Sequence, residues 1–338
     1  MKREDNGAID IFITWVDSSD EIWKKEKQEW ERKLNKRPCN DDDRYQSWDN
    51  LQYLFRGIES CMPWINRVFF ITWGHVPDFL NINHPKLVIV RHKDYIPEEY
   101  LPTYNSNVIE MNLHRIEELS ENFILFNDDT FPIQPIEESY YFKNNKVCDE
   151  AIETIIAPHN LPTMVGYYRN INISAIINKH FNKREVQRKN FKKWFNLEYG
   201  IKGIRTIILH YYKTFSFFTN SHEPQAMKKS TLKEIWNKEE KLLHTSSQNK
   251  FRSYSDVGQY LIRFWQLCKG EFYPKRRIGK SFMVNDKNCR DVANIIRQKK
   301  YKVISINEEH DLGDWEFVKS EINKAFQEIF PDKSSFEL

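Results

Sequence analysis

The sequence predicts an α/β fold with a mostly parallel sheet, because short apolar runs alternate with helical patterns along its first 135 residues. Four runs are rich in β-branched and aromatic residues and nearly free of polar ones, as expected of strands buried on both faces. These runs cover residues 8–16, 67–73, 86–91 and 122–127. Helices are expected between them, so consecutive strands can lie parallel in one sheet.

Two helices are predicted in this first part. The helix at about 48–60 has an apolar face, and Pro63 follows it and cannot continue the hydrogen-bond ladder. The face comprises Leu51, Leu54, Phe55 and Ile58. A second helix is predicted at about 107–119, with Asn107 and Glu110 at the spacing of a capping box.

The remaining chain divides into two parts. Residues 136–220 mix aromatic and basic residues without a clean period, which indicates an inserted subdomain with short helices. Residues 221–338 regain clear patterns and return to the core. There we predict a helix opening with a Thr231/Glu234 capping box, helices at about 255–268, 288–300 and 314–330, and a strand at 301–307. The expected organisation is a core at 1–135, an insertion at 136–220 and the remainder of the core at 221–338.

Composition limits the class of protein. The 338 residues are 29% charged and 14% aromatic, as in globular proteins, and the net charge of +3 does not indicate a nucleic-acid binder. Two basic runs, 182–193 and 273–280, are either solvated faces or contacts for an anionic partner such as a phosphorylated substrate or a membrane surface.

The cysteines and the N-terminus bear on the compartment. Five scattered cysteines without a CxxC motif argue against a disulfide framework and a structural zinc site. The first residues lack an apolar signal core, and no apolar run reaches the roughly 18 residues that a spanning helix needs. We therefore expect a cytosolic protein, with peripheral membrane attachment as an open option.

Acidic residues follow two of the predicted strands. Asp17 and Asp20 come after the first, and Asp128 and Asp129 come after the fourth. Each pair alone is typical of a polar turn. Both pairs should lie at the carboxyl edge of one sheet, where α/β proteins bind ligands, and carboxylates there could hold a divalent cation bound to a diphosphate.

Three other residues are candidates for chemistry. Glu110 lies on the predicted helix 107–119, on a face that is either solvated or the wall of a pocket. His222 and Arg252 lie in loops that precede predicted helices, where free backbone N–H groups attract anions. A histidine can move protons near neutral pH and an arginine suits phosphate, although both are often simply solvated in loops.

Four segments of the sequence together resemble the signature blocks of the Stealth family, in the expected order over about residues 8–290. The first two blocks are matched by "IDIFITWVDSSD", "DNLQYLFRGIESCMPWINRVFFITWGHVPDFLN" and "LPTYNSNVIEMNLHRIEELSENFILFNDDTF". The third is matched by "HEPQAMKKSTLKEIW…TSSQNKFRSYSD" and the fourth by "FMVNDKNC". The family comprises hexose-1-phosphate transferases, among them bacterial capsule and cell-surface polysaccharide phosphotransferases.

The resemblance implies a nucleotide-sugar-transferase-like core, of the GT-A or Rossmann-like type, at 1–135. It implies a UDP-sugar donor, a glycan or lipid-linked oligosaccharide acceptor, and Mg²⁺ or another divalent cation held by Asp128 and Asp129. The implied catalytic residues are Glu110, Asp129, His222 and Arg252. The residues implied to bind the nucleotide are Trp15, Val16, Asp17, Arg56, Asn285 and Asp286.

Two alternatives stay open at this point. A metal-dependent glycosyltransferase would use the same acidic edge but would break the bond at the anomeric carbon and release UDP. A noncatalytic glycan-binding protein would carry the acidic residues only as structural turns.

Overall fold

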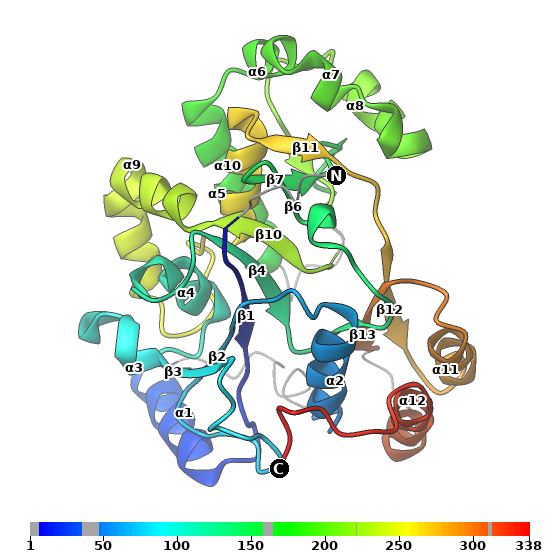
Figure 1. Cartoon of the computed structure of the whole chain (residues 1–338). Coiled ribbons are helices and arrows are strands. Elements are labelled where there is room, and N and C mark those ends of the chain that lie inside the picture. The colour runs from blue at the N-terminus through cyan, green and yellow to red at the C-terminus, as the bar shows by residue number, and fades with distance from the viewer. Residues whose placement is uncertain (1–6, 36–46, 158–164, 221, 310–312) are drawn as a thin grey trace.

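The computed structural model describes residues 7–35, 47–157, 165–220, 222–309 and 313–338. A five-stranded sheet forms the centre of the molecule, in the strand order β10-β4-β1-β2-β3 (Figure 1). The strands are β1 (Ile9–Thr14), β2 (Val68–Thr72), β3 (Leu87–Arg91), β4 (Asn122–Asn127) and β10 (Gln225–Lys228). All neighbours are parallel except β10, which pairs antiparallel with β4. The predicted mixed α/β class, the mostly parallel sheet and its four N-terminal strands are confirmed.

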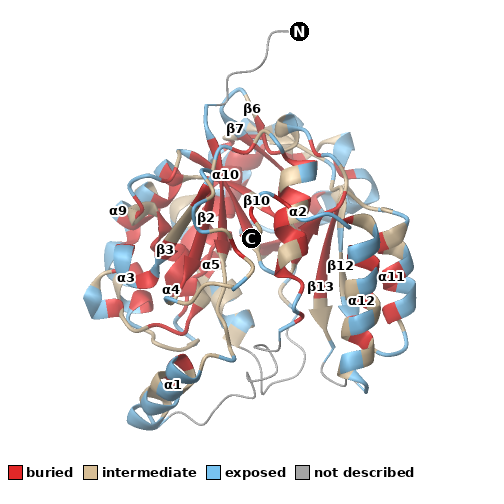
Figure 2. Ribbon diagram, turned by 60° about the horizontal axis from the view of Figure 1, so that its bottom comes forward, coloured by how far each residue is buried: buried red, intermediate tan, exposed pale blue. Residues whose placement is uncertain are grey.

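The register of this sheet sets the position of its loops. Thr14 at the end of β1 pairs with Asn127 at the end of β4, and with Ile71 of β2. The loops that follow β1 and β4 therefore leave the sheet side by side at its carboxyl edge. Strands β1, β2 and β4 are almost entirely buried, which explains their continuous apolar runs (Figure 2).

A second sheet of three strands, ordered β12-β13-β5, joins the last part of the chain to the first. It consists of β5 (Thr130–Pro132), β12 (Gly279–Val284) and β13 (Val303–Glu308). Because β5 follows β4 after only Asp128 and Asp129, this acidic turn connects the two sheets. Helices α11 (Cys289–Arg297) and α12 (Trp315–Ile329) pack beside the second sheet, close to their predicted positions (Figure 1).

Two smaller sheets and a group of helices lie beyond β10. The sheets comprise β6 (Phe142–Lys143), β7 (Lys146–Asp149) and β11 (Phe272–Pro274) in one, and β8 (Glu153–Thr154) and β9 (Phe217–Phe218) in the other. The helices there are α5 (Val165–His180), α6 (Lys183–Lys189), α7 (Phe191–Trp194), α8 (Ile204–Leu209) and α10 (Tyr260–Lys269). The 3₁₀ segment Leu197–Gly203 joins α7 to α8. The three-part division at residues 135 and 220 stays a prediction.

The other helices surround the central sheet. They are α1 (Glu21–Lys33), α2 (Leu51–Cys61), α3 (His92–Tyr95), α4 (Ser106–Met111) and α9 (Lys229–Ser247). Short 3₁₀ segments cover Glu98–Tyr100, Leu113–Arg115 and Glu138–Tyr140. The predicted apolar face of α2 is buried in the core, as expected from its spacing.

Some local predictions are wrong. The helix predicted at 107–119 ends at Met111. The side-chain amide of Asn112 donates to the Val108 carbonyl (2.9 Å) and so competes with the backbone hydrogen bond that would continue the helix. The first turn of α4 is capped by Asn105. Thr231 does not cap a helix, because α9 already begins at Lys229 and buries Thr231.

Four of the five cysteines lie in the described part of the chain, and none of these four is in a disulfide. Cys61, Cys148, Cys268 and Cys289 are buried, and Cys39 lies outside the described residues. No helix that the structure describes has the length and apolar character to cross a bilayer.

Candidate active site

The loop after β1 forms a compact turn at the carboxyl edge of the sheet. The Asp17 carboxylate accepts hydrogen bonds from the Ser19 amide (2.8 Å) and hydroxyl (2.6 Å), and its backbone N–H donates to His75 Nε2 (2.7 Å). Asp20 caps α1 by accepting from the amides of its first turn. The turn reading of this pair is therefore confirmed, and Asp17 additionally faces the end of β2 through His75.

Trp15 and Val16 lie between this turn and the sheet. The Trp15 ring is half-buried, with its centroid 5.2 Å from His75 and 5.5 Å from Phe70. An aromatic ring held in this way at a sheet edge could stack on a base. The structure thus holds Trp15 and Asp17 beside the acidic turn after β4, as the order of the strands requires.

The acidic turn after β4 meets His222. His222 Nε2 lies 2.9 Å from Asp129 Oδ2, and the Asn127 amide lies 3.3 Å from the same nitrogen. Asn307, at the end of β13, donates to the same Asp129 oxygen. Three distant segments of the chain therefore converge on one carboxylate.

Backbone contacts hold this convergence in place. The Ser305 hydroxyl donates to the His222 carbonyl (2.5 Å), and the Ile306 amide donates to the Asp129 carbonyl (3.0 Å). His222 adopts a positive φ of 49°, a conformation that costs energy for a residue other than glycine. The expectation that His222 precedes a helix is wrong, because strand β10 begins at Gln225.

The charges of this cluster shift its titrations. Burial lowers the pKa of His222, but the hydrogen bond and negative charge of Asp129, together with Asp128, outweigh burial, so that the net pKa is raised. Loss of hydration and then the neighbouring charge of Asp129 raise the pKa of Asp128 to about 7, although Asp128 keeps contact with solvent. Glu308, at the end of β13, adds to this repulsion.

Glu110 joins the cluster from α4. It is only 5% exposed, and burial raises its pKa to about 7 against the opposing positive charges of Arg169 and His222. Its helix face is the wall of a packed interior and not a solvated face. Arg169 lies on α5, in the segment whose sequence lacked a clear period, so its place beside Glu110 could not be predicted.

Arg252 reaches the same helix from another loop. Its guanidinium Nη2 donates to the Ser106 hydroxyl (3.4 Å) at the first residue of α4. The buried Asp256 carboxylate holds the two segments together, accepting from the Asn105 and Asn107 side chains (3.0 and 3.1 Å). Arg252 and Glu110 are thus positioned by one shared network, although α10 begins only at Tyr260.

The fourth sequence block lies one strand away from Asp129. Asn285 and Asp286 follow β12, which pairs in parallel with β13, so they lie beside the end of β13. Asn285 donates to Glu309 (2.5 Å) and accepts from the Asn288 amide (3.0 Å), while Asp286 is exposed. These contacts form the turn into α11.

Arg56 has a different environment. Its guanidinium makes a bidentate ion pair with Glu337, at 2.8 and 2.7 Å, and donates to the Phe330 carbonyl (2.8 Å). Both side chains of the ion pair are largely buried. The structure therefore places the Arg56 guanidinium against the C-terminal segment, whereas Glu110, Asp129 and His222 form one cluster.

The acidic turn has the character of a partial cation site. Among the described residues, no three histidine, cysteine or acidic side chains form a cage for a metal ion. Loss of hydration contributes most to the raised pKa of Asp128, and repulsion from Asp129 adds to it; a cation would relieve that repulsion. Mg²⁺ is often held by one or two carboxylates together with substrate phosphates, so these two residues fit a cation shared with a diphosphate.

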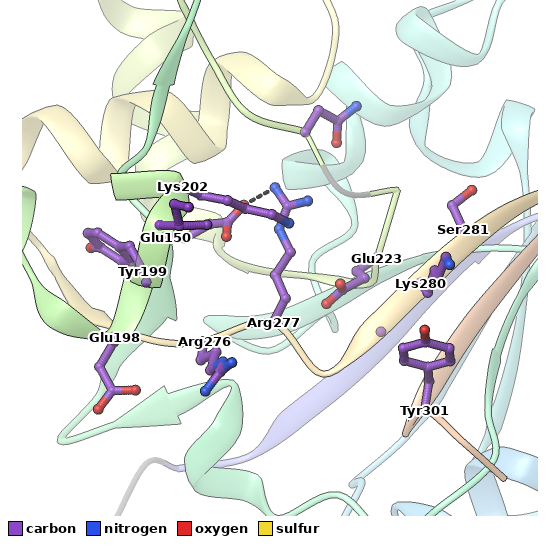
Figure 3. Close-up of a pocket in the computed structure, with 14 residues that line it drawn as sticks. Glu150, Glu198, Tyr199, Lys202, Glu223, Arg276, Arg277, Lys280, Ser281 and Tyr301 are labelled. Carbon is purple, nitrogen blue, oxygen red and sulfur yellow. Dashed lines mark ion pairs between the residues drawn. The ribbon is translucent and has the colours of Figure 1, made fainter. Parts of the chain in front are cut away.

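A cavity of about 560 Å³ adjoins the His222 loop (Figure 3). Asn220 and Glu223, on either side of the loop tip, contribute to its wall. Residues 198–202 form another part, and Arg276, Arg277 and Lys280 bring basic groups to it. Arg277 pairs with Glu150 inside the cavity. Part of the basic run 273–280 thus lines a cavity and is not simply a solvated surface.

Comparison with known proteins shows which family the chain resembles. Residues 44–150 match the family model described as Stealth protein CR2, conserved region 2. A capsular polysaccharide phosphotransferase, WcwK, of Streptococcus pneumoniae is 40% identical over 97% of this chain and 98% of its own. A receptor polysaccharide phosphotransferase, WefC, of Streptococcus gordonii is 34% identical over 98% and 99%. An exopolysaccharide phosphotransferase, cps2G, of Lactiplantibacillus plantarum is 29% identical over 97% and 96%.

Similarity of this extent over nearly the whole of both chains defines a transferase enzyme with an α/β core. The chain belongs to the Stealth family of phosphotransferases.

Proposed function

We propose that the enzyme transfers a sugar-1-phosphate from a UDP-sugar to a hydroxyl of a glycan acceptor during synthesis of a cell-surface or capsular polysaccharide. The observation that carries this proposal is the cluster of Asp129, His222 and Glu110 at the carboxyl edge, in a chain 40% identical to a capsular polysaccharide phosphotransferase. The core would be of the nucleotide-sugar-transferase (GT-A) type, with Trp15, Val16 and Asp17 beside the nucleotide.

In the proposed reaction, the acceptor oxygen attacks the phosphorus nearer the sugar. A new O–P bond forms, the bond from that phosphorus to the bridging oxygen breaks, and UMP leaves with the electron pair. The hydroxyl proton passes to His222, and Asp129 stabilises the resulting imidazolium, consistent with the raised pKa of His222. General base catalysis of this kind typically contributes ~10²–10⁴-fold in rate.

The other residues would neutralise and position charge. Arg252, beside the N-terminus of α4, would contact the phosphoryl oxygens. Glu110, with a pKa of about 7, would hold a proton near neutral pH and donate it in a hydrogen bond to the substrate. Asp128 and Asp129 would hold Mg²⁺, which when bound would neutralise the charge of the diphosphate.

The released nucleotide tests this proposal. Purified enzyme is incubated with a panel of UDP-sugars and a glycan acceptor, and the nucleotide product is identified by chromatography. UMP is expected; UDP would instead establish the glycosyltransferase reaction. His222→Asn, Asp129→Asn and Arg252→Ala should each reduce UMP release at least about a hundredfold. Exposed Asp291→Ala on α11 is the matched control.

A binding protein without catalytic activity predicts a different result. It would release no nucleotide from any UDP-sugar, and the three substitutions would leave polysaccharide assembly in cells unchanged.

We further propose that the enzyme acts in the cytoplasm on a lipid-linked oligosaccharide, with peripheral attachment to the membrane. The basic runs 182–193 and 273–280 are consistent with anionic partners of this kind.

A further inference from the structure

Helix α8 (Ile204–Leu209) exposes its aliphatic residues and buries a polar one, the reverse of a typical surface helix of a soluble protein. Its polar residue Thr206 is fully buried, whereas Ile204, Ile207 and Ile208 are exposed. Amphipathic helices normally turn their aliphatic residues inward, so this arrangement requires a cause.

The cause is a buried polar network beneath the helix. The Thr206 hydroxyl accepts from the Glu153 amide (3.0 Å), and the Glu153 carboxylate accepts from Lys183 (2.7 Å) and Gln187 (2.6 Å). Lys183 and Glu153 are at most 1% exposed. Rotating α8 to bury its isoleucines would leave the Glu153 amide and the Thr206 hydroxyl unpaired, which costs free energy. The outward position of the isoleucines is therefore built into the fold.

Neighbouring segments add to this apolar face. Leu197 and Ile201, in the 3₁₀ segment between α7 and α8, are 98% and 83% exposed. Phe195 of the same region packs edge-on against His210, which links α7 to the end of α8. The resulting apical surface comprises Phe191, Leu197, Ile201, Ile204, Ile207, Ile208, Tyr211 and Tyr212. It lies at one end of the molecule, with α6, α7 and α8 (Figure 1).

The charge of this region identifies the partner. Without the buried Lys183, residues 184–213 contain eight lysines and arginines and two glutamates, a net charge of +6. The whole chain carries +3, so the rest of the chain carries −3. Lys192, Lys202, Arg205 and Lys213 are exposed among the apolar side chains. A second copy of this chain would bring the same positive charge to the contact and would be repelled.

We propose that the apical surface docks the enzyme on an anionic lipid bilayer. Aliphatic and tyrosine side chains enter the boundary between head groups and acyl chains, and the surrounding lysines and arginines meet the lipid phosphates. The short helices α7 and α8 lie on the membrane and do not span it.

The surface is connected with the active site. Residues 198–202 border the apical surface and also line the cavity next to the His222 loop, together with Asn220 and Glu223. Lys202 lines this cavity, as do Glu150 and Arg277 (Figure 3). The cavity therefore connects residues of the apical surface with the segment around His222, where a lipid-linked acceptor would approach. The docking surface specifies the peripheral attachment of the proposed function, and it is tested without substrate.

Vesicle binding tests the proposal without any substrate. The full chain is sedimented with vesicles of phosphatidylcholine alone or mixed with phosphatidylglycerol, at low and high salt. Binding is expected only with phosphatidylglycerol and should weaken with salt. The triple variant Leu197→Ser, Ile201→Ser, Ile208→Ser should bind the vesicles at least about tenfold more weakly than the unchanged protein. The double variant Lys192→Glu, Arg205→Glu should show a loss of the same size.

The matched control removes exposed isoleucines elsewhere, as Ile22→Ser, Ile82→Ser, and should bind as the unchanged protein does. Circular dichroism checks that each variant is folded. Equal vesicle binding by the triple variant, or no binding by the unchanged protein, would overturn the proposal. So would sedimentation velocity showing a dimer that only the apical substitutions dissociate. Nucleotide release with a soluble glycan acceptor is measured separately, so a failure of the proposed reaction leaves the docking result intact.

Discussion

At the residue scale, Asp129 governs the protonation of His222. The contact of 2.9 Å and the negative charge of Asp129 raise the pKa of His222 in spite of burial. Removing the charge should let burial dominate, so Asp129→Asn should lower the pKa of His222. An NMR titration of the histidine ring protons measures this.

His84, which contacts Ser335, provides an internal reference in the same spectra. An unchanged or higher pKa of His222 in the variant would show that Asp129 does not control it.

The raised pKa of His222 also makes the stability of the protein depend on pH. Because the folded pKa is raised, the contact stabilises the protein fully below the unfolded pKa of 6.5 and loses this effect as pH rises through the folded value.

Glu110 gives stability a pH dependence of the same sign, but here burial and not a neighbouring charge raises the pKa. Burial raises its pKa from 4.5 to about 7, so the folded protein keeps a proton that the unfolded chain loses between these values. The free energy of unfolding should fall over this range by roughly 3 kcal/mol because of Glu110. In Glu110→Gln this contribution is absent, so the variant should gain stability relative to the unchanged protein as pH rises from 4.5 to 7.

Urea unfolding of both proteins at several pH values measures that difference. Other titrating groups are common to both and cancel in the comparison. A constant difference across the range would mean that Glu110 is ionised in the folded state. The variant is also expected to lose phosphotransfer activity, which separates stability from function at a single position.

At the scale of elements, α4 is positioned by the loop that carries Arg252. Asp256 is fully buried and accepts from Asn105, Asn107 and the Ser253 amide. Asp256→Ala leaves these donors without their acceptor and should destabilise the protein by about 1–3 kcal/mol. Because Arg252 and Glu110 lose their common support, turnover of the remaining folded enzyme should fall about ten- to a hundredfold.

Unfolding curves and kcat of the folded fraction check the two effects separately. Asp291→Ala, on the exposed face of α11, should change neither. If Asp256→Ala lowers stability but leaves kcat unaltered, the loop supports the fold without positioning the catalytic groups.

The elements also show what the sequence could predict. Buried strands such as β1 and β4 are continuous apolar runs, and their parallel register places Asp17 and Asp128 at one edge by geometry alone. The end of α4 depends on the hydrogen bond from Asn112 to the Val108 carbonyl, which competes with a strong helical pattern. Hydrophobic spacing carries no information about that competition.

At the scale of the whole molecule, contacts between segments far apart in the sequence bring residues to the site that sequence patterns could not predict. Asn307 and Glu308 approach Asp128 and Asp129 only because β13 pairs antiparallel with β5, across more than 170 residues of sequence. Arg169 meets Glu110 from a helix whose amphipathic pattern is weak. No local signal in either segment marks these residues, whereas His222 and Arg252 were identified through the family resemblance.

Arg56 tests the predicted nucleotide pocket at this largest scale. Its ion pair with Glu337 joins α2 to the C-terminal segment, and both side chains are at most 10% exposed. Leaving one buried charge unpaired is costly, so Arg56→Ala and Glu337→Ala should each destabilise the protein by about 2–4 kcal/mol. The double variant should lose clearly less stability than the sum of the two single losses, because neither charge is then buried without its partner.

The same variants separate a structural from a nucleotide-binding role for Arg56. If its role is to join α2 to the C-terminal segment, KM for the UDP-sugar should stay within about twofold in Arg56→Ala at a temperature where the variant is folded. Glu337→Ala, which frees the guanidinium without removing it, should give the same KM. A tenfold rise in KM in Arg56→Ala alone would show that Arg56 contacts the donor, as the resemblance implies. The ion pair would then serve to hold Arg56 at the edge of the nucleotide pocket, and α2 would belong to the active site.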